Sequence, residues 1–151
     1  MGILLSEIFD SRAIKLNLEG ATKEAAFNEL SDAITTVHPE CNQSMVLTAL
    51  WERESKLSTG ITSGIAIPHA ICRGLNSIAG AIGISPTGIE YGALDNKPVY
   101  VVFMLAMSEP ARENHLFVLS QISRLIQSQM FVSIKNAHNV REVHDILSRF
   151  N

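Results

Sequence analysis

The sequence predicts an α/β (α+β) fold in which a small mixed β-sheet carries helices on both faces, giving three α/β/α layers. The segment 99–107 is almost entirely apolar and too short to span a bilayer, as expected of a central, buried strand. Other segments show the helical spacing of apolar residues, and strands and helices do not strictly alternate. With 151 residues, the chain has the length of one ordinary domain, which we expect to span residues 1–151.

The N-terminal part of the chain predicts a strand followed by two helices. Residues 13–18 alternate between apolar and polar side chains, which is typical of a half-buried strand. Thr22 suits the N-cap of a helix that ends before Pro39. Asn42 suits the N-cap of a second helix, which includes Arg53.

The remaining elements follow from apolar spacing and from local signals. Pro68 disfavours the helical conformation in the residue before it, so residues 65–67 should be extended and His69 should emerge at their end. Asn139 and Glu142 have the spacing of a capping motif for a last helix. We further expect a short apolar piece at 3–9, a strand at 77–84, a turn-rich segment at 86–95, and helices at 113–126 and 129–136.

Composition and charge exclude several classes of protein. With 46% hydrophobic and 18% charged residues, the chain is neither disordered nor a coiled coil. The net charge is −3, and the 12 Lys and Arg residues form no basic stripe. We therefore expect no nucleic-acid partner.

The N-terminus and the cysteines indicate a cytoplasmic protein. The N-terminus lacks the basic region and cleavage site of a signal peptide, and Cys41 and Cys72 are interpreted as packing residues in a reducing compartment. Residues 1–6 match a myristoylation pattern, but this pattern is short and is often matched by chance. We expect no stable membrane insertion.

The segment from Arg53 to His69 contains the residue types that carrying a phosphoryl group requires. Its glycines allow backbone N–H groups to approach an anion, and its Ser and Thr hydroxyls can donate to phosphate oxygens. Arg53 offers a planar fork of donors, and a neutral imidazole such as that of His69 is a good nucleophile near pH 7. Residue types alone leave an ordinary loop open, and no Gly-Lys-Ser/Thr follows as in a P-loop.

The order and spacing of these residues are more specific. They resemble the active-site signature of enzyme IIA of the bacterial phosphoenolpyruvate:sugar phosphotransferase system, fructose/mannitol type, a family that includes the nitrogen-regulatory IIA proteins. The resemblance covers essentially the whole chain. The matching residues, in family order, are Arg53-Glu54, Ser58-Thr59-Gly60-Ile61, Gly64-Ile65-Ala66-Ile67-Pro68-His69, the segment from Gly88-Ile89-Glu90 to Val99, and His115-Leu116 with Leu119-Ser120.

The resemblance implies a role for each matching residue. His69 would be the phosphorylated histidine, modified on the ring nitrogen remote from the backbone. His115 would be the second active-site histidine, a hydrogen-bond partner of the phosphoryl group or its acceptor, and Arg53 would neutralise phosphate charge. The residues implied to bind phosphate are Ser58, Thr59, Ser63 and Gly64.

The resemblance also implies partners. The chain would take a phosphoryl group from HPr or an HPr-like protein and pass it to a cysteine of enzyme IIB, with IIB and the permease on separate proteins. Because such large donors must reach His69, we expect a shallow, partly apolar contact face around it that includes Ile71 and Leu75. No metal and no organic cofactor is needed, because the histidine itself carries the group. The alternative is a nitrogen-regulatory type of binding protein, in which phosphorylation of His69 changes the regulatory target protein that is bound.

The sequence departs from the family pattern in two places. Thr62-Ser63 stand where the family often has Gly-Asn, and Lys56-Leu57 replace a pair in which Gly is common. A homologue that folds but no longer transfers phosphate therefore stays open.

The rival chemistry to a phosphohistidine is a zinc site at His69 and His115 with Glu54 or Glu113, although the chain has no His-x-x-x-His or Cys-x-x-Cys pair to anchor it.

Overall fold

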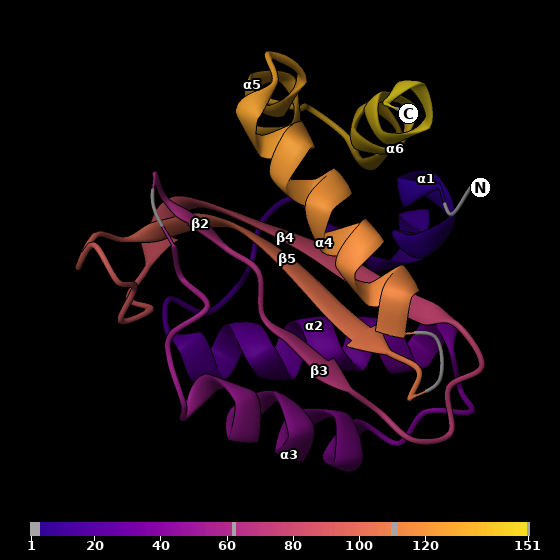
Figure 1. Cartoon of the computed structure of the whole chain (residues 1–151). Helices are drawn as coiled ribbons and strands as arrows, with labels where there is room; N and C mark the ends of the chain where they lie inside the picture. Colours follow the sequence, from indigo (N-terminus) through magenta and orange to yellow (C-terminus); the bar gives the residue numbers. More distant parts are fainter. Residues whose placement is uncertain (1–3, 62, 110–111, 151) are drawn as a thin grey trace.

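The computed structural model describes residues 4–61, 63–109 and 112–150 and places a five-stranded mixed sheet between two layers of helices (Figure 1). The strands lie in the order β1-β4-β5-β2, and β3 pairs with β5 as well. β4 and β5 are antiparallel, whereas β1 runs parallel to β4, and β2 and β3 run parallel to β5. The strands are β1 (Ile14–Lys15), β2 (Ile65–Ala66), β3 (His69–Ile71), β4 (Ile78–Ile89) and β5 (Val99–Met107).

Helices cover both faces of this sheet, which confirms the predicted fold class (Figure 1). On one face lie α2 (Lys23–Val37) and α3 (Gln43–Glu54). On the other face lie α1 (Leu5–Ile8), α4 (Arg112–Gln127), α5 (Met130–Lys135) and α6 (Val140–Arg149), and a short 3₁₀ turn (Ser11–Ala13) precedes β1.

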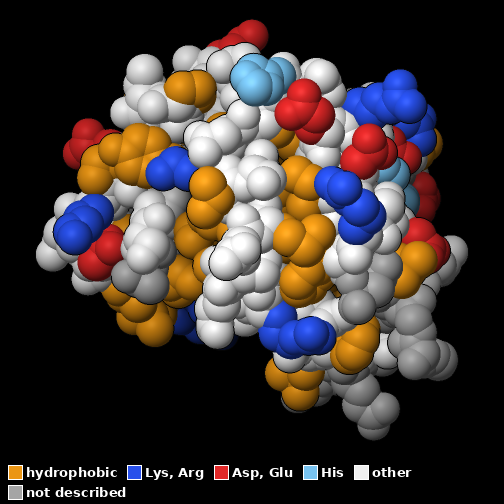
Figure 2. Space-filling model, turned by 90° about the horizontal axis from the view of Figure 1, so that it is seen from above, with side chains coloured by type: hydrophobic (Ala, Val, Ile, Leu, Met, Phe, Trp, Pro, Cys, Tyr) orange, Lys and Arg blue, Asp and Glu red, His pale blue; other side chains and the backbone are white. Residues whose placement is uncertain are grey.

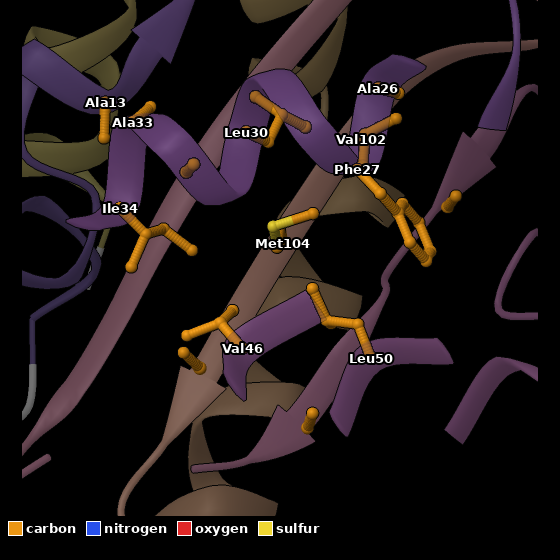
Figure 3. Close-up of a cluster of buried hydrophobic side chains, with 14 of the residues drawn as sticks. Ala13, Ala26, Phe27, Leu30, Ala33, Ile34, Val46, Leu50, Val102 and Met104 are labelled. Carbon is orange, nitrogen blue, oxygen red and sulfur yellow. The ribbon is translucent and has the colours of Figure 1, made fainter. Parts of the chain in front are cut away.

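β5 is buried on both faces and joins the two hydrophobic cores, as its apolar sequence predicts. Val102 and Met104 pack with side chains of α2 and α3, a cluster shown in Figure 3. Phe103 and Leu105 point to the opposite face and pack with α4, α5 and α6. This alternation is the two-residue period of a strand that has a core on each side.

The edge of the sheet is built so that His69 begins a strand. β2 and β3 lie one after the other along β5, pairing with Val101–Val102 and then with Leu105–Met107. Between them stands Pro68, which has no N–H to donate but whose carbonyl accepts a hydrogen bond from Leu105 N at 2.9 Å. The extended conformation predicted for residues 65–67 is confirmed over Ile65–Ala66.

The helix caps predicted from the sequence are confirmed. The side chains of Thr22, Asn42 and Asn139 each accept a hydrogen bond from the backbone N–H three residues later, at the starts of α2, α3 and α6. Each cap satisfies a backbone donor that the first turn of its helix leaves unpaired. The caps therefore fix where α2 and α3 begin below the sheet.

The prediction for the segment after residue 85 needs correction, and the structure assigns a helix to the N-terminal apolar piece. The segment 86–89 was expected to be turn-rich, but β4 continues through it to Ile89. Pro86 is tolerated because the pairing with β5 is irregular between Ile84 and Ile89 and needs no donor there. The apolar piece at 3–9 contains a short helix, Leu5–Ile8, whose Leu5 and Ile8 side chains are buried.

The face formed by α4, α5 and α6 carries mixed charges. Seen from above, blue and red side chains are interspersed on it, with hydrophobic side chains visible between them (Figure 2). None of the helices in the described ranges has the length and apolar character that crossing a membrane requires.

We predict that Leu125→Ala lowers the free energy of unfolding by about 2–5 kcal/mol. Leu125 belongs to α4 and its side chain is fully buried in the core, so its truncation leaves a cavity. Leu116→Ala on the same helix is the matched control. Leu116 is 66% exposed, so its truncation should change stability by less than about 1 kcal/mol. Urea unfolding of both variants measures the difference, and equal losses would contradict the described packing of α4.

Candidate active site

A cleft of about 390 Å³ opens between α3, β3 and the first turns of α4. It brings together the three residues to which the sequence assigned the main chemical roles, Arg53, His69 and His115. They come from three different elements, and positions 53 and 115 lie far apart in the sequence. Its other lining residues include Ala49, Glu52, Lys56, Ala70, Ile71, Met107, Leu116 and Leu119.

His69 is held in one orientation by the chain that leads into β3. Its Nδ1 lies 2.7 Å from the carbonyl oxygen of Ile67. A carbonyl only accepts hydrogen bonds, so Nδ1 carries the proton and Nε2 keeps its lone pair. The imidazole is therefore oriented with its more remote nitrogen as the nucleophile.

The surroundings of His69 keep it neutral. Burial is the main cause that lowers its pKa below the ordinary value, and the nearby positive charge of Arg53 acts in the same direction. The hydrogen bond to Ile67 and the negative charge of Glu54 oppose this shift without reversing it. Near pH 7 the imidazole is thus unprotonated on Nε2, as nucleophilic attack requires.

His115 lies in the wall of the cleft contributed by α4. Its side chain is buried, with 4% of the residue exposed, and its Nε2 has no hydrogen-bond partner within the described part of the chain. Buried polar atoms are nearly always paired in folded proteins, and an unpaired one costs about 1–3 kcal/mol. Because His115 lines the same cleft as His69, its unpaired nitrogen is a candidate partner for an oxygen of a group bound there.

Arg53 reaches the cleft from the last turn of α3. One terminal nitrogen, Nη1, donates to the carbonyl of Leu57 at 2.7 Å. This bond orients the planar guanidinium and leaves its other N–H groups for an anion. Arg53 therefore offers a fixed positive fork beside His69.

The predicted phosphate-binding residues Ser58, Thr59, Ser63 and Gly64 do not line this cleft. The Thr59 hydroxyl is buried and donates its proton to Glu54 Oε1 at 2.6 Å, so the same proton is not available to a phosphoryl oxygen. Ser58 Oγ accepts a hydrogen bond from Gly60 N at 3.1 Å. A phosphate-binding role for the four residues stays a prediction.

Ser63 and Gly64 form the turn that leads into β2. Both have positive φ angles, 60° and 78°, a region in which Gly and Asn are favoured over Ser. A Cβ at position 64 would also lie 2.8 Å from the ring of Tyr100, so Gly64 serves a close approach as well as a turn. Thr62, the other departure from the family pattern, lies outside the described residues.

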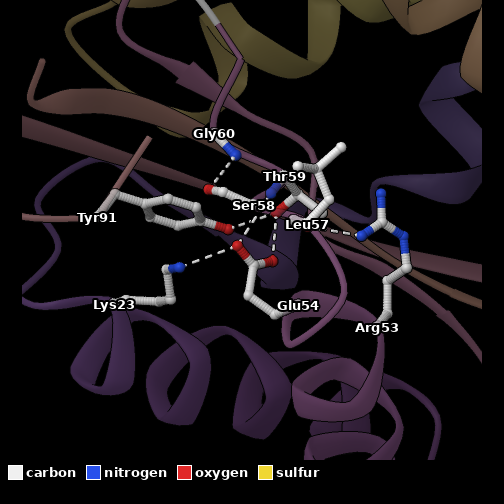
Figure 4. A network of polar contacts seen from close by, with 8 residues as sticks. All are labelled: Lys23, Arg53, Glu54, Leu57, Ser58, Thr59, Gly60 and Tyr91. Atoms are coloured by element: carbon white, nitrogen blue, oxygen red, sulfur yellow. Dashed lines mark hydrogen bonds and ion pairs between the residues drawn. The ribbon is translucent and has the colours of Figure 1, made fainter. Parts of the chain in front are cut away.

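A buried polar cluster behind the cleft was not predicted from the sequence. Glu54 accepts hydrogen bonds from Thr59 and from Lys23, and the Tyr91 hydroxyl lies 2.7 Å from Thr59 Oγ1 (Figure 4). Burial raises the pKa of Glu54, but the bonds from Thr59 and Lys23 outweigh it and hold the pKa below its ordinary value. Glu54 and Thr59 belong to the sequence motif and Tyr91 lies in the second matching segment, 88–99, but nothing in the sequence placed these residues together, and Lys23 lies in no matching segment.

The rival zinc site finds no support. Among the residues that the structure describes, no group of three or more His, Cys, Asp or Glu is placed to hold a metal ion. Glu54, one of the predicted ligands, is instead bonded to Lys23 and Thr59. The side chain of Glu113, the alternative acidic ligand, lies outside the described part of the structure.

Both cysteines are buried, and the structure describes them as free thiols. Cys72 directly follows β3, the strand that begins with His69. Burial raises the pKa of the Cys72 thiol to about 11. The packing role predicted for both cysteines agrees with their place in the core beside α2 and α3.

This arrangement has counterparts among known proteins. The family model described as phosphoenolpyruvate-dependent sugar phosphotransferase system, EIIA 2, matches residues 7–150. The chain belongs to this EIIA 2 family. Members of the family are components of a phosphotransferase system, and the resemblance seen in the sequence is confirmed.

Relatives of this EIIA 2 chain come from both branches of the family. It is 32% identical over 145 residues to the "PTS system fructose-specific EIIA component" of Haloferax volcanii, covering 95% of this chain and 94% of that protein. The crystal structure of nitrogen regulatory protein IIA-Ntr from Neisseria meningitidis superposes with a TM-score of 0.87 at 29% identity, covering 95% and 98% of the two chains. The chain is 36% identical over 125 residues to the Bacillus subtilis fructose-specific EIIABC component; this match covers 83% of the chain but 20% of that protein.

In this EIIA 2 chain the rim of the cleft is partly apolar. Ile71 and Leu75 were both predicted to face a protein partner. Ile71 is 45% exposed and lines the cleft, but Leu75 is 5% exposed and packs in the core beside α2 and α3. The prediction for Leu75 is therefore wrong, because the turn after β3 directs its side chain inward.

We predict that His69 titrates with a midpoint below about 6.5 and that Arg53→Met raises this midpoint, because removal of a nearby positive charge favours protonation. The C2–H chemical shift of His69, followed by NMR between pH 4 and 9 in about half-unit steps, measures both values. Arg73→Met removes an exposed cation that pairs with Glu109 and should leave the midpoint unchanged. A wild-type midpoint above 6.5 would contradict the described burial of the ring.

Proposed function

We propose that this chain is a phosphocarrier of the phosphotransferase system that accepts a phosphoryl group on Nε2 of His69. The observation that carries the proposal is the bond from His69 Nδ1 to the Ile67 carbonyl, which frees Nε2 beside Arg53 and the unpaired Nε2 of His115. The chain acts as a single EIIA domain over residues 1–151 in the cytoplasm. Family membership supports this function.

The transfer is an in-line displacement between two histidines. The lone pair of His69 Nε2 attacks the phosphorus while the bond from phosphorus to the donor's histidine nitrogen breaks, and the electron pair stays on the donor. His69 Nδ1 keeps its proton throughout, held by Ile67. Arg53 balances the charge of the three phosphoryl oxygens, and His115 binds one of them through Nε2 when this nitrogen is protonated.

The donor is HPr or an HPr-like phosphocarrier, and the acceptor is a cysteine of enzyme IIB. Because both partners are whole proteins, they need an exposed contact surface around the cleft. Exposed apolar side chains provide it: Ile71 and Leu116 line the cleft and are 45% and 66% exposed. Phe117, on the same helix as Leu116, is 42% exposed.

A second function, a nitrogen-regulatory switch, is favoured by the similarity to IIA-Ntr over nearly the whole of both chains. Phosphorylation adds about two negative charges to a cleft that now holds a net positive fork, which changes the surface that a target protein meets. In this case the phosphoryl group need not leave for enzyme IIB. The chemistry on His69 is the same in both functions.

The two functions differ in the fate of the phosphoryl group. Incubation of the phosphorylated chain with a purified enzyme IIB transfers the group to the IIB cysteine if the chain serves sugar uptake. Retention of the group, together with phosphorylation-dependent capture of a kinase or channel subunit, indicates the regulatory function.

We predict that the chain, incubated with phosphoenolpyruvate, enzyme I and HPr, gains one acid-labile phosphoryl group, which intact mass spectrometry detects. His69→Ala removes the only proposed nucleophile and should gain none. His138→Ala is the matched control, because this side chain is 88% exposed and pairs only with Glu142 in the described structure. A folded wild-type chain that stays unlabelled beside a labelled control IIA would overturn the transferase function for this donor.

We also predict that His115→Ala slows phosphorylation of His69 by about 100-fold without abolishing it, because one donor to the phosphoryl oxygens is lost while the nucleophile remains. Quenched-flow measurement of the labelling rate tests this. His115→Gln, which retains an N–H donor, should lose less. A rate unchanged in both variants would exclude contact between His115 and the phosphoryl group.

A further inference from the structure

The polar cluster around Glu54 is largely buried, and both oxygens of its carboxylate have hydrogen-bond partners. The Glu54 side chain is 3% exposed, and both of its oxygens are bonded. Oε2 accepts from Thr59 N and from Lys23 Nζ, each at 2.9 Å, and Oε1 accepts from the Thr59 hydroxyl. Because the Thr59 proton goes to the carboxylate, the Tyr91 hydroxyl donates to Thr59 Oγ1. The cluster thus locks Thr59 to the end of α3.

The Glu54–Thr59 bonds close a turn whose Leu57 carbonyl orients Arg53. The turn runs from Glu54 to Thr59, and its apex includes Leu57, whose carbonyl accepts from Arg53 Nη1 (Figure 4). The first half of the turn is held to α3, because Ser55 Oγ donates to the Glu52 carbonyl at 2.7 Å and Lys56 N donates to the Arg53 carbonyl at 3.2 Å. The Leu57 side chain is 57% exposed and adds little to its position. The Glu54–Thr59 bonds hold the second half of the turn, on the other side of the Leu57 carbonyl.

The same turn is tied to the backbone that orients the nucleophile. The Thr59 carbonyl accepts a hydrogen bond from Ile67 N at 3.0 Å, and the Ile67 carbonyl binds His69 Nδ1 at 2.7 Å. One residue, Thr59, is thus linked through Leu57 to Arg53 and through Ile67 to His69. A shift of Thr59 would change the distance between the cation and the nucleophile.

We propose that Glu54 and Thr59 are positioning residues that aim the Arg53 guanidinium at the phosphoryl group carried by His69. They touch neither the phosphoryl group nor the donor protein, and they act through the Leu57 carbonyl. This inference rests on the proposed phosphocarrier function. It gives the Ser58-Thr59-Gly60 motif a different task from the direct phosphate binding that the sequence resemblance implies.

The test compares three threonine variants in the phosphoryl-transfer assay. Thr59→Val keeps the shape of the side chain but loses the hydroxyl, and we expect the labelling rate at saturating phospho-HPr to fall about 10-fold, with KM changed by less than about two-fold. Thr59→Ser retains the hydroxyl and should restore most of the rate. Thr36→Val, on the exposed side of α2 where the hydroxyl bonds only within its own helix, should have no effect.

A double-mutant cycle separates positioning from mere stability. In an Arg53→Met background, Thr59→Val should slow labelling by less than about two-fold, because the group that it positions is gone. A full 10-fold loss in that background would overturn the proposal, as would equal rates for the Thr59→Val and Thr36→Val variants. Unfolding curves of each variant show that the labelled fraction is folded.

A further readout does not depend on transfer. The order parameter of the Arg53 Nε–H group, from ¹⁵N relaxation, should fall in Thr59→Val and stay unchanged in Thr36→Val. If the wild-type chain takes no label, the proposed function fails, while this measurement still decides whether Thr59 orients Arg53. An order parameter that is equal in all three proteins would overturn the positioning role.

Discussion

Strand β5 is buried on both faces, and the strand and helices that line the candidate active site pair or pack with it. β3, which begins with His69, pairs with β5 in parallel, and Met107 at the end of β5 lies in the floor of the cleft. α3 packs beneath the same sheet, so Arg53 is placed by the core that Val102 and Met104 share with the helices. A strand that cannot move without opening two cores is a rigid base for groups that must meet a protein-borne phosphate.

Neighbouring residues at the end of α3 face opposite surroundings. Arg53 lies at the cleft with free N–H groups, whereas Glu54 is turned inward and fully bonded. The burial of a carboxylate is unfavourable by itself, and Lys23 and Thr59 offset it. Among the described residues that line the cleft, Arg53 and Lys56 stand against the single carboxylate of Glu52, next to a neutral imidazole, while the charge of Glu54 is paired with Lys23. This arrangement attracts an anionic group without pairing Arg53 in advance.

Much of this structure was predictable from local sequence signals, whereas its long-range contacts were not. The caps at Thr22, Asn42 and Asn139 and the apolar run of β5 depend on residues close in sequence, so their elements were placed well. The motif from Arg53 to His69 located two groups of the cleft, and the separate family element at His115-Leu116 located the third. The polar cluster around Glu54 and Thr59 was missed because Lys23 and Tyr91 come from distant segments, and even the family-like segment that contains Tyr91 gave no sign that it meets Thr59. Leu75 was misplaced because exposure after a short edge strand depends on tertiary packing.

The buried state of Cys72 has a consequence for the direction of phosphate flow. In a relay that alternates between histidine and cysteine on different proteins, a thiol of the carrier itself is a competing acceptor, and this one follows the strand that bears the nucleophile. With its pKa raised to about 11 by burial, only about one thiol in ten thousand is ionised at pH 7. The thiolate is the reactive form, so Cys72 competes poorly for the phosphoryl group that we propose His69 to carry.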